Sequence, residues 1–261
     1  MAKLYFLLLL LTLLLLACQK KDVEPIPAKT LGCTEIMEQT HTLSLLAMQL
    51  VFETVTTDTS HPDYNNVLLP AKLLDKTTDD LTAISQLNDK ESDTVFNMAQ
   101  IHKYFRNDVL RMLTVEAPKT PCTDKLRYYS ITHQCSPIDS LLAKYNFSTH
   151  KVSTEPYPPG TGDIKYTFTF SACLPLNTVA MAKKLKQTGL VYSAVPLPQF
   201  GRTNLQVFVE RTATHTLYTF GYGWDDCPSG CMSWRFWKFS VSAMGKATFI
   251  ESWGDDNPLF L

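Results

Sequence analysis

Apolar side chains recur along the chain with two different periods, and each period predicts one kind of element. Residues 34–54 and 73–87 carry apolar side chains at helical spacing, which predicts two N-terminal helices. Apolar and polar residues alternate over 93–104 and 109–115, which predicts two strands. The chain is therefore expected to begin with helices and to continue with strands.

Two further elements are predicted near the middle of the chain. Ser136 and Pro137 suit the N-cap and the first position of a helix, which we expect over 137–145. Residues 164–170 alternate strictly, which predicts a strand with one buried face. That face carries Tyr166, Phe168 and Phe170.

The rest of the chain is predicted to be mostly sheet. Asn177 suits a helix N-cap and Gly189 a helix end, so a helix over 177–188 and a strand over 190–195 complete a strand–helix–strand unit. Four alternating segments then predict an antiparallel meander: 205–210, 214–222, 234–241 and 246–252. The predicted fold is α+β, with N-terminal helices followed by a mainly antiparallel sheet, the strand–helix–strand unit and the four-stranded meander.

Residues 33–261 are predicted to form a single α+β globular domain. The chain of 261 residues is long enough to bury a substantial core, and its 45% hydrophobic content is normal for a globular protein. The densest cluster of Pro and Gly falls at 156–162. This cluster is either a long hairpin loop or a point at which the domain subdivides.

The N-terminal residues predict an export signal. Lys3 is followed by a leucine-rich run from Leu4 to Leu16. The run is shorter than the roughly twenty residues that a membrane-spanning helix needs, so it suits the core of a signal peptide.

The residues after this run indicate lipidation. Leu15-Leu16-Ala17-Cys18 resembles the bacterial lipobox. The resemblance implies a lipoprotein signal peptide over 1–17 and acyl chains on Cys18. Two or three acyl chains would hold the protein on a membrane, because each buried methylene contributes about 0.8 kcal/mol. An ordinary signal peptide followed by a chance cysteine is the alternative.

Residues 18–32 are expected to be a flexible tether, since they contain Pro25 and Pro27 and few large apolar side chains. Residues 19–24 resemble the lysine and acid signature of surface lipoproteins of the Bacteroidota, with the two acids separated by Val23. The expected location is the outer membrane, with the periplasmic face and the cell surface both open.

Charge and glycine content exclude several function classes. The 25 acidic and 24 basic side chains give a formal net charge of -1, and no basic run is interleaved with aromatic residues. Nucleic acid is therefore not expected as a partner. The glycines form neither a dinucleotide fingerprint nor a phosphate loop, so we expect no nucleotide cofactor, and we assign no cofactor of another kind.

The cysteine count fits an exported protein. Removing Cys18 leaves six of the seven cysteines, and thiols pair outside the cytosol, so three disulfides are expected among fifteen connectivities. Cys227 and Cys231 flank Pro-Ser-Gly, which favours a tight turn and a local bridge. A redox or metal site is the alternative for this pair, but redox pairs have two intervening residues and zinc requires further ligands.

Four cysteines remain: Cys33, Cys122, Cys135 and Cys173. A bridge from Cys122 to Cys135 would close a loop worth roughly 3 kcal/mol of chain entropy, which makes it the second expected pair. Cys33 with Cys173 is then left by subtraction.

Several segments resemble one family. Gly189 to Pro196, Gly223 to Cys231 and the aromatic strand Trp234 to Phe239 are similar to the C-terminal half of secreted proteins and lipoproteins of the Bacteroidota. Residues 61–66 and 93–97 are similar to the N-terminal half of these proteins. The resemblance implies export and the α+β fold, and it brings no activity. Residues 177–196 also resemble the end of subtilisin-type propeptides, which would imply a protease-inhibitor-like domain.

Aromatic side chains are concentrated near the C-terminus. On one strand, Trp234 and Phe236 share one face, and Trp237 and Phe239 share the other. One face must cover the core, and the other is a candidate for an exposed platform that binds sugar rings or peptide. The candidate ligand-binding residues are Trp224, Trp234 and Phe236. The alternative is that helices cover both faces.

Catalytic and metal-binding patterns are weak. The Gly-x-Ser-x-Gly motif is absent, Ser229 suits a turn, and His102 and His215 are lone histidines on predicted strands. A calcium site could form if four loop carboxylates gathered in space: Asp225, Asp226, Asp255 and Asp256. Adjacent Asp pairs in loops are usually solvated turn residues.

The export signal and the missing catalytic motifs together predict a membrane-anchored lipoprotein. We expect it to be a non-enzymatic, extracytoplasmic binding or interaction module with a glycan or protein ligand. A secreted hydrolase of unrecognised type and a protease-inhibitor-like domain are the alternatives.

Overall fold

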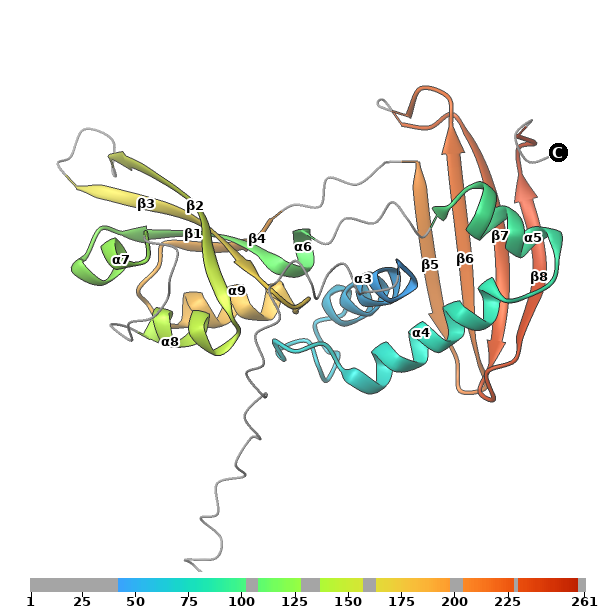
Figure 1. Cartoon of the computed structure of the whole chain (residues 1–261), viewed down its shortest axis with the longest axis horizontal. Coiled ribbons are helices and arrows are strands. Elements are labelled where there is room, and N and C mark those ends of the chain that lie inside the picture. The colour runs from blue at the N-terminus through green and yellow to red at the C-terminus, as the bar shows by residue number, and fades with distance from the viewer. Residues whose placement is uncertain are drawn as a thin grey trace, which may run out of the picture.

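The protein has two four-stranded antiparallel sheets with helices packed against them (Figure 1). This computed structural model describes residues 42–101, 108–127, 137–156, 163–197, 204–227 and 230–257. The first sheet has the strand order β2-β3-β1-β4 and the second the order β5-β6-β7-β8. The predicted α+β class, with helices first and a C-terminal meander, is confirmed.

Two N-terminal helices cover one face of the second sheet. They are α3 (Thr42–Thr57) and α4 (Ala71–Ser85), close to the predicted ranges within the described residues. Leu81 and Ile84 of α4 and Leu46 of α3 are fully buried in the same core as Phe220 and Phe239 of the sheet. The helical spacing of these residues brings them to one side of each helix, and burial of that side holds the helices on the sheet.

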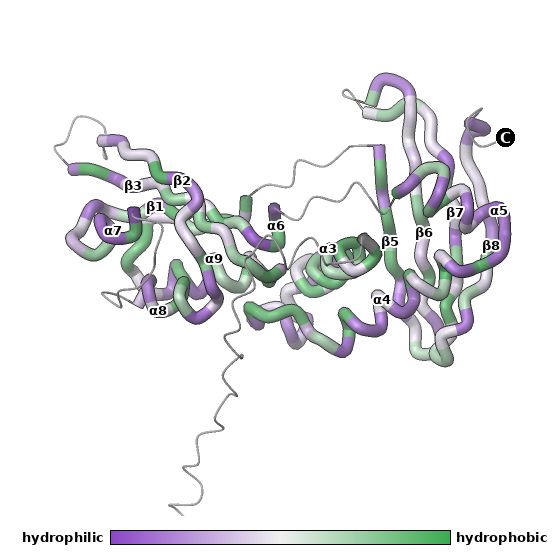
Figure 2. Tube along the Cα trace, viewed as in Figure 1, coloured by the Kyte–Doolittle hydropathy of each residue, from purple (hydrophilic) through white to green (hydrophobic). Residues whose placement is uncertain are grey.

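Helix α3 is apolar on most of its surface, whereas α4 is half polar (Figure 2). The difference follows from position, since α3 lies between the two sheets in Figure 1. Leu46 and Leu50 pack into the core of the second sheet, and Phe52 packs against Val109 and Leu110 on the side of the first sheet. A helix that is covered on two sides needs apolar residues on both.

The strand predicted at 93–104 is wrong. The described part of this segment forms α5 (Lys90–Asp93) and a π-helical turn, η1 (Thr94–Met98), and residues 102–107 lie outside the described residues. Val95 and Phe96 are both buried, which a half-exposed strand does not allow for adjacent residues. Asp89 is the N-cap of α5, and its carboxylate accepts a hydrogen bond from the Ser92 amide at 2.7 Å.

The first sheet contains the predicted strand at 164–170 as β3 (Ile164–Ala172), and its three aromatic side chains are fully buried. Strand β1 (Met112–Pro118) begins three residues later than predicted, because α6 (Asp108–Arg111) precedes it. Its partners are β3 and β4 (Ser193–Pro196), not the segment at 93–104.

Strand β2 (Phe147–Pro156) was not predicted. It lies at the edge of the first sheet and buries only Phe147 and Thr149, so its sequence lacks an apolar alternation. Because β2 and β3 pair antiparallel on either side of 157–162, the Pro and Gly cluster separates two strands of one sheet.

Helix α9 (Thr178–Gln187) confirms the predicted strand–helix–strand unit. Asn177 is its N-cap and accepts a hydrogen bond from the Ala180 amide at 3.0 Å, and Gly189 follows its end with φ of 70°. Two shorter helices, α7 (Pro121–Lys125) and α8 (Pro137–Lys144), complete the described part of this region. Ser136, the predicted cap of α8, lies outside the described residues.

The second sheet is the predicted meander. Its strands are β5 (Leu205–Arg211), β6 (His215–Trp224), β7 (Ser233–Ser242) and β8 (Ala247–Gly254). Each strand pairs antiparallel with the next.

The first sheet is inserted between the N-terminal helices and the meander that they cover. The inserted part enters at α6 and leaves after β4, and its two ends meet where the Leu197 amide donates to the Met112 carbonyl at 2.9 Å. A small junction core joins the two parts, with Phe52, Val109 and Leu110 buried in it. The single domain predicted for 33–261 thus contains two sheets, each with its own core. In the described part of the chain, no helix has the length and apolarity to cross a membrane.

Candidate functional site

One face of the second sheet is left uncovered by the helices. Tyr218 and Phe220 of β6 and Trp237 and Phe239 of β7 point to the helix-covered side and are buried. Because side chains alternate along a strand, Trp234 and Phe236 point to the opposite side. No helix in the described part of the chain lies on that side (Figure 1).

Three aromatic rings on this face form what we call the aromatic ladder: Trp234, Phe236 and Trp253. The centroids of Trp234 and Phe236 lie 5.7 Å apart with ring planes 10° from parallel. Phe236 and Trp253, directly opposite on β8, lie 5.4 Å apart with planes 19° from parallel. Trp253 is 41% exposed, and the other two rings are half-buried. Trp234 and Phe236 therefore lie on the sheet face that the described helices leave uncovered, together with Trp253, and their ligand-binding role stays a prediction.

Two glycines of β6 lie beneath the ladder. Gly221 is paired with Phe236, and Gly223 with Trp234. A β-carbon at position 221 would lie 2.7 Å from Cε1 of Phe236, and one at 223 would lie 2.9 Å from Cε2 of Trp234. The rings thus rest against the bare glycine backbone, an arrangement known to stabilise glycine in sheets. Gly221 and Gly223 alternate along β6 as Trp234 and Phe236 do along β7, and the strand register places the two pairs opposite each other.

Trp234 is held at the end of β7 by its neighbours. Its indole nitrogen donates to the Cys231 carbonyl at 3.2 Å, and its amide donates to Oδ2 of Asp255 at 3.0 Å. The disulfide between Cys227 and Cys231, which confirms the predicted local bridge, closes the connection just before this strand. The bridge therefore helps to position the first ring of the ladder.

Trp224 does not belong to the ladder. It pairs with Ser233 at the end of β6 and points to the same side as Tyr222, with which it stacks at 6.4 Å between centroids. Trp224 therefore lies on the opposite face of the sheet from Trp234 and Phe236, and its role as a ligand-binding residue stays a prediction. A high density of aromatic residues in the sequence does not show on which face of the sheet each side chain lies. The register between β6 and β7 determines this.

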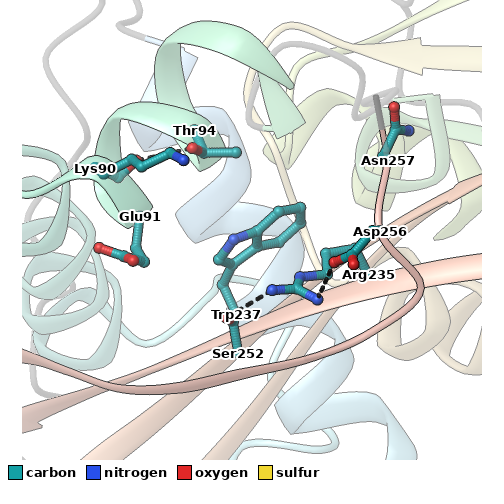
Figure 3. A pocket seen from close by; sticks show the side chains of 8 residues that line it. All are labelled: Lys90, Glu91, Thr94, Arg235, Trp237, Ser252, Asp256 and Asn257. Carbon is teal, nitrogen blue, oxygen red and sulfur yellow. Dashed lines mark hydrogen bonds and ion pairs between the residues drawn. The ribbon is translucent and has the colours of Figure 1, made fainter. Parts of the chain in front are cut away.

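A polar pocket lies on the helix-covered side of the sheet, between the α5–η1 segment and the strands β7 and β8 (Figure 3). Its volume is about 110 Å³. Arg235 crosses it, and the guanidinium donates to Asp256 at 3.2 Å, to Ser252 at 3.1 Å and to the Gly254 carbonyl at 3.3 Å. The remaining lining residues are Lys90, Glu91, Thr94, Trp237 and Asn257.

The described lining of this pocket has the chemistry of a small polar binding site without an activated nucleophile. The Ser252 hydroxyl accepts from Arg235, and no histidine is among the described residues that line the pocket. A serine needs a neighbouring base to become nucleophilic.

The described catalytic and metal candidates do not gather into one site. His102 and Ser229 lie outside the described residues, and the half-buried His215 contacts the Thr214 hydroxyl at 2.9 Å. Asp255 binds the Trp234 amide and Asp256 pairs with Arg235. Among the residues that the structure describes, no three His, Cys, Asp or Glu side chains gather as metal ligands would.

The buried Lys165 side chain has a structural role. The Lys165 ammonium on β3 contacts Glu116 at 2.9 Å and Glu155 at 2.6 Å. Hydrogen bonds to the two carboxylates raise the pKa of Lys165, so the amine stays charged and is not a nucleophile.

The remaining cysteines are described in part. Cys122 and Cys173 are disulfide-bonded. Cys18, Cys33 and Cys135 lie outside the described residues, so the pairings that involve them stay predictions.

Comparison with known proteins finds no matching family model, curated protein or solved structure.

Proposed function

We propose that the protein is a lipid-anchored, extracytoplasmic binding module of the outer membrane, and that its ligand binds on the aromatic ladder. The leucine run and the Leu15-Leu16-Ala17-Cys18 motif support the anchor. The tether over 18–32 would let the globular part reach away from the membrane, on the periplasmic face or the cell surface.

The observation that carries the binding role is the position of the ladder. Large aromatic side chains are costly to leave in water, and exposed apolar patches usually mark interaction sites. Trp234, Phe236 and Trp253 lie on a sheet face that no described helix covers, although the same strands bury Trp237 and Phe239 under helices. A ligand that covers the rings would recover this apolar burial.

The anchor is tested by fractionation and acyl labelling. We expect Cys18→Ala to move the protein from the membrane to the soluble fraction and to abolish the label, because the acylated sulfur is lost. The double variant Cys227→Ala/Cys231→Ala is the control, since it removes two thiols and keeps Cys18. Unchanged membrane association of Cys18→Ala would contradict the anchor.

The binding role is tested against the hydrolase alternative by screening the purified mature chain with glycans, peptides and esters for both binding and turnover. We expect binding that depends on the ladder, without product formation. Robust turnover that a single histidine or carboxylate substitution abolishes would replace this proposal with an enzyme.

A further inference from the structure

We propose that the ligand of the aromatic ladder is an uncharged oligosaccharide of pyranose rings. This inference rests on the proposed binding role and names its ligand class.

The shape of the ladder suits sugar rings. Its three rings are stacked with planes within 10° and 19° of their neighbours, so they form one continuous aromatic surface whose rings share nearly one orientation. A pyranose has one face made largely of C–H groups and carries its hydroxyls around the rim. Such a face packs on an aromatic ring while the hydroxyls stay free to bond sideways. The rings at the two ends of the ladder, Trp234 and Trp253, would each take one sugar.

The backbone beneath the ladder argues against an extended peptide. Strands β6 and β7 are the two central strands of the sheet, and each is hydrogen-bonded to a neighbour on both sides. A peptide that binds by strand addition needs the free main-chain groups of a sheet edge. Trp234 and Phe236 lie on β7, so a ligand over these two rings must be held by ring faces and side chains, whereas Trp253 lies on the edge strand β8.

The polar side chains around the ladder complement hydroxyl groups. By the strand register, Gln206 lies beside Gly221, and the next row across the sheet consists of Phe208, Thr219, Lys238 and Glu251, with Phe208 52% exposed. The polar side chains of these two rows offer an amide, a hydroxyl, an ammonium and a carboxylate, which together donate and accept. Sugar hydroxyls also do both.

The charges on this face indicate an uncharged ligand. Lys238 and Glu251 are opposite each other on β7 and β8, and Glu210 lies farther along the same face of β5. There is no excess of cations in this row to pair with acidic sugars. A carboxylated or sulfated glycan would therefore lose solvation without gaining an ion pair.

The rings are held before the ligand arrives. Gly221 and Gly223 support Phe236 and Trp234, and the indole of Trp234 is bonded to Cys231. Little side-chain freedom remains to be lost on binding, which favours affinity at a shallow surface.

The test titrates the purified full mature chain, in detergent, with neutral oligosaccharides: cellopentaose, chitopentaose and mannopentaose. Tryptophan fluorescence and calorimetry report binding. We expect at least one of them to bind with a Kd of roughly 10 µM to 1 mM, the range of a shallow site. Trp253→Ala is expected to weaken binding at least about tenfold, because it removes one stacking ring without opening a core.

Two further variants keep the test independent of folding. Trp253→Phe retains a flat ring and is expected to recover most of the affinity. Tyr192→Ala removes a ring that is 50% exposed near the first sheet, and it should leave binding unchanged. Circular dichroism on each variant checks that the fold is intact.

Two comparison probes separate this inference from the binding role. If a proline-rich peptide or an acidic oligogalacturonate binds through the ladder and the neutral sugars do not, the ligand class is wrong and the binding role stands. If no probe of any class binds in a way that Trp253→Ala weakens, both are overturned.

Discussion

At the scale of single residues, Glu53 is a half-buried acid on the helix between the two sheets. Its carboxylate accepts a hydrogen bond from the buried Gln49 amide at 2.7 Å. Loss of hydration by burial raises the pKa of Glu53 above its ordinary value, and the bond from Gln49 opposes this only in part. The charged form of Glu53 therefore works against folding at neutral pH.

We expect Glu53→Gln to stabilise the protein at neutral pH. Because the pKa is higher in the folded state, the folded chain binds more protons than the unfolded chain between the two pKa values, and stability falls as pH rises through them. The gain from Glu53→Gln should be largest above the raised pKa and should vanish below the ordinary range of glutamate. Urea unfolding from acidic to neutral pH measures it, with exposed Glu210→Gln as the control. A gain that is equal at all pH values would contradict the role of desolvation.

The ladder shows which residue properties are visible in the sequence. Alternation along β7 correctly places Trp234 and Phe236 on one face, because period two is a local property. The face of Trp224 and the support from Gly221 depend on pairing between strands, which local periodicity does not give.

At the scale of elements, a buried polar contact joins α4 to the second sheet. The Tyr218 hydroxyl donates to Oδ2 of Asp80 at 3.0 Å, and the Lys76 ammonium contacts Oδ1 of the same carboxylate at 3.0 Å. Asp80 is 2% exposed. Burial, together with the charge of Asp80, raises the pKa of Tyr218 well above its ordinary value, so the hydroxyl remains a donor.

Tyr218→Phe is expected to destabilise the protein by about 1.5–3 kcal/mol, since a buried carboxylate loses one of its donors. Lys76→Ala, in which the lost ammonium is largely exposed, should cost no more than about 1 kcal/mol. Chemical unfolding at neutral pH measures both. If Lys76→Ala proves the more harmful, the exposed ion pair and not the tyrosine hydroxyl satisfies Asp80.

Elements with a strong local period were predicted, and the others were not. The buried alternation of β3 and the apolar spacing of α4 each arise from one face packed on a core. Strand β2 has nearly no buried face, because it lies at an edge. Val95 and Phe96 belong to a short helical segment, and both pack into the core of the second sheet. The apolar pattern of such a short segment resembles that of a strand.

At the scale of the whole molecule, the N-terminal helices cover a sheet that is built from the last quarter of the chain. Nothing in the local pattern shows that 108–197 is inserted between them, since the insertion appears only through contacts far apart in sequence. Asn177 makes one such contact by donating from its side chain to the Tyr64 carbonyl at 3.0 Å. The inserted part is thus connected to the rest of the protein by the segment before α4 and by the junction core.

Leu110 in the junction core should couple the two sheets. It is fully buried in the same cluster as Phe52 of α3, and Val179 of α9 packs against that cluster. We expect Leu110→Ala to cost about 2–5 kcal/mol through the cavity that it leaves. Since α3 packs on the second sheet and α9 belongs to the first, native-state hydrogen exchange should show lower protection in both β3 and β7. Leu142→Ala, in the first core alone, should lower protection in β3 and spare β7. Loss confined to one sheet in Leu110→Ala would show that the inserted part and the meander unfold independently.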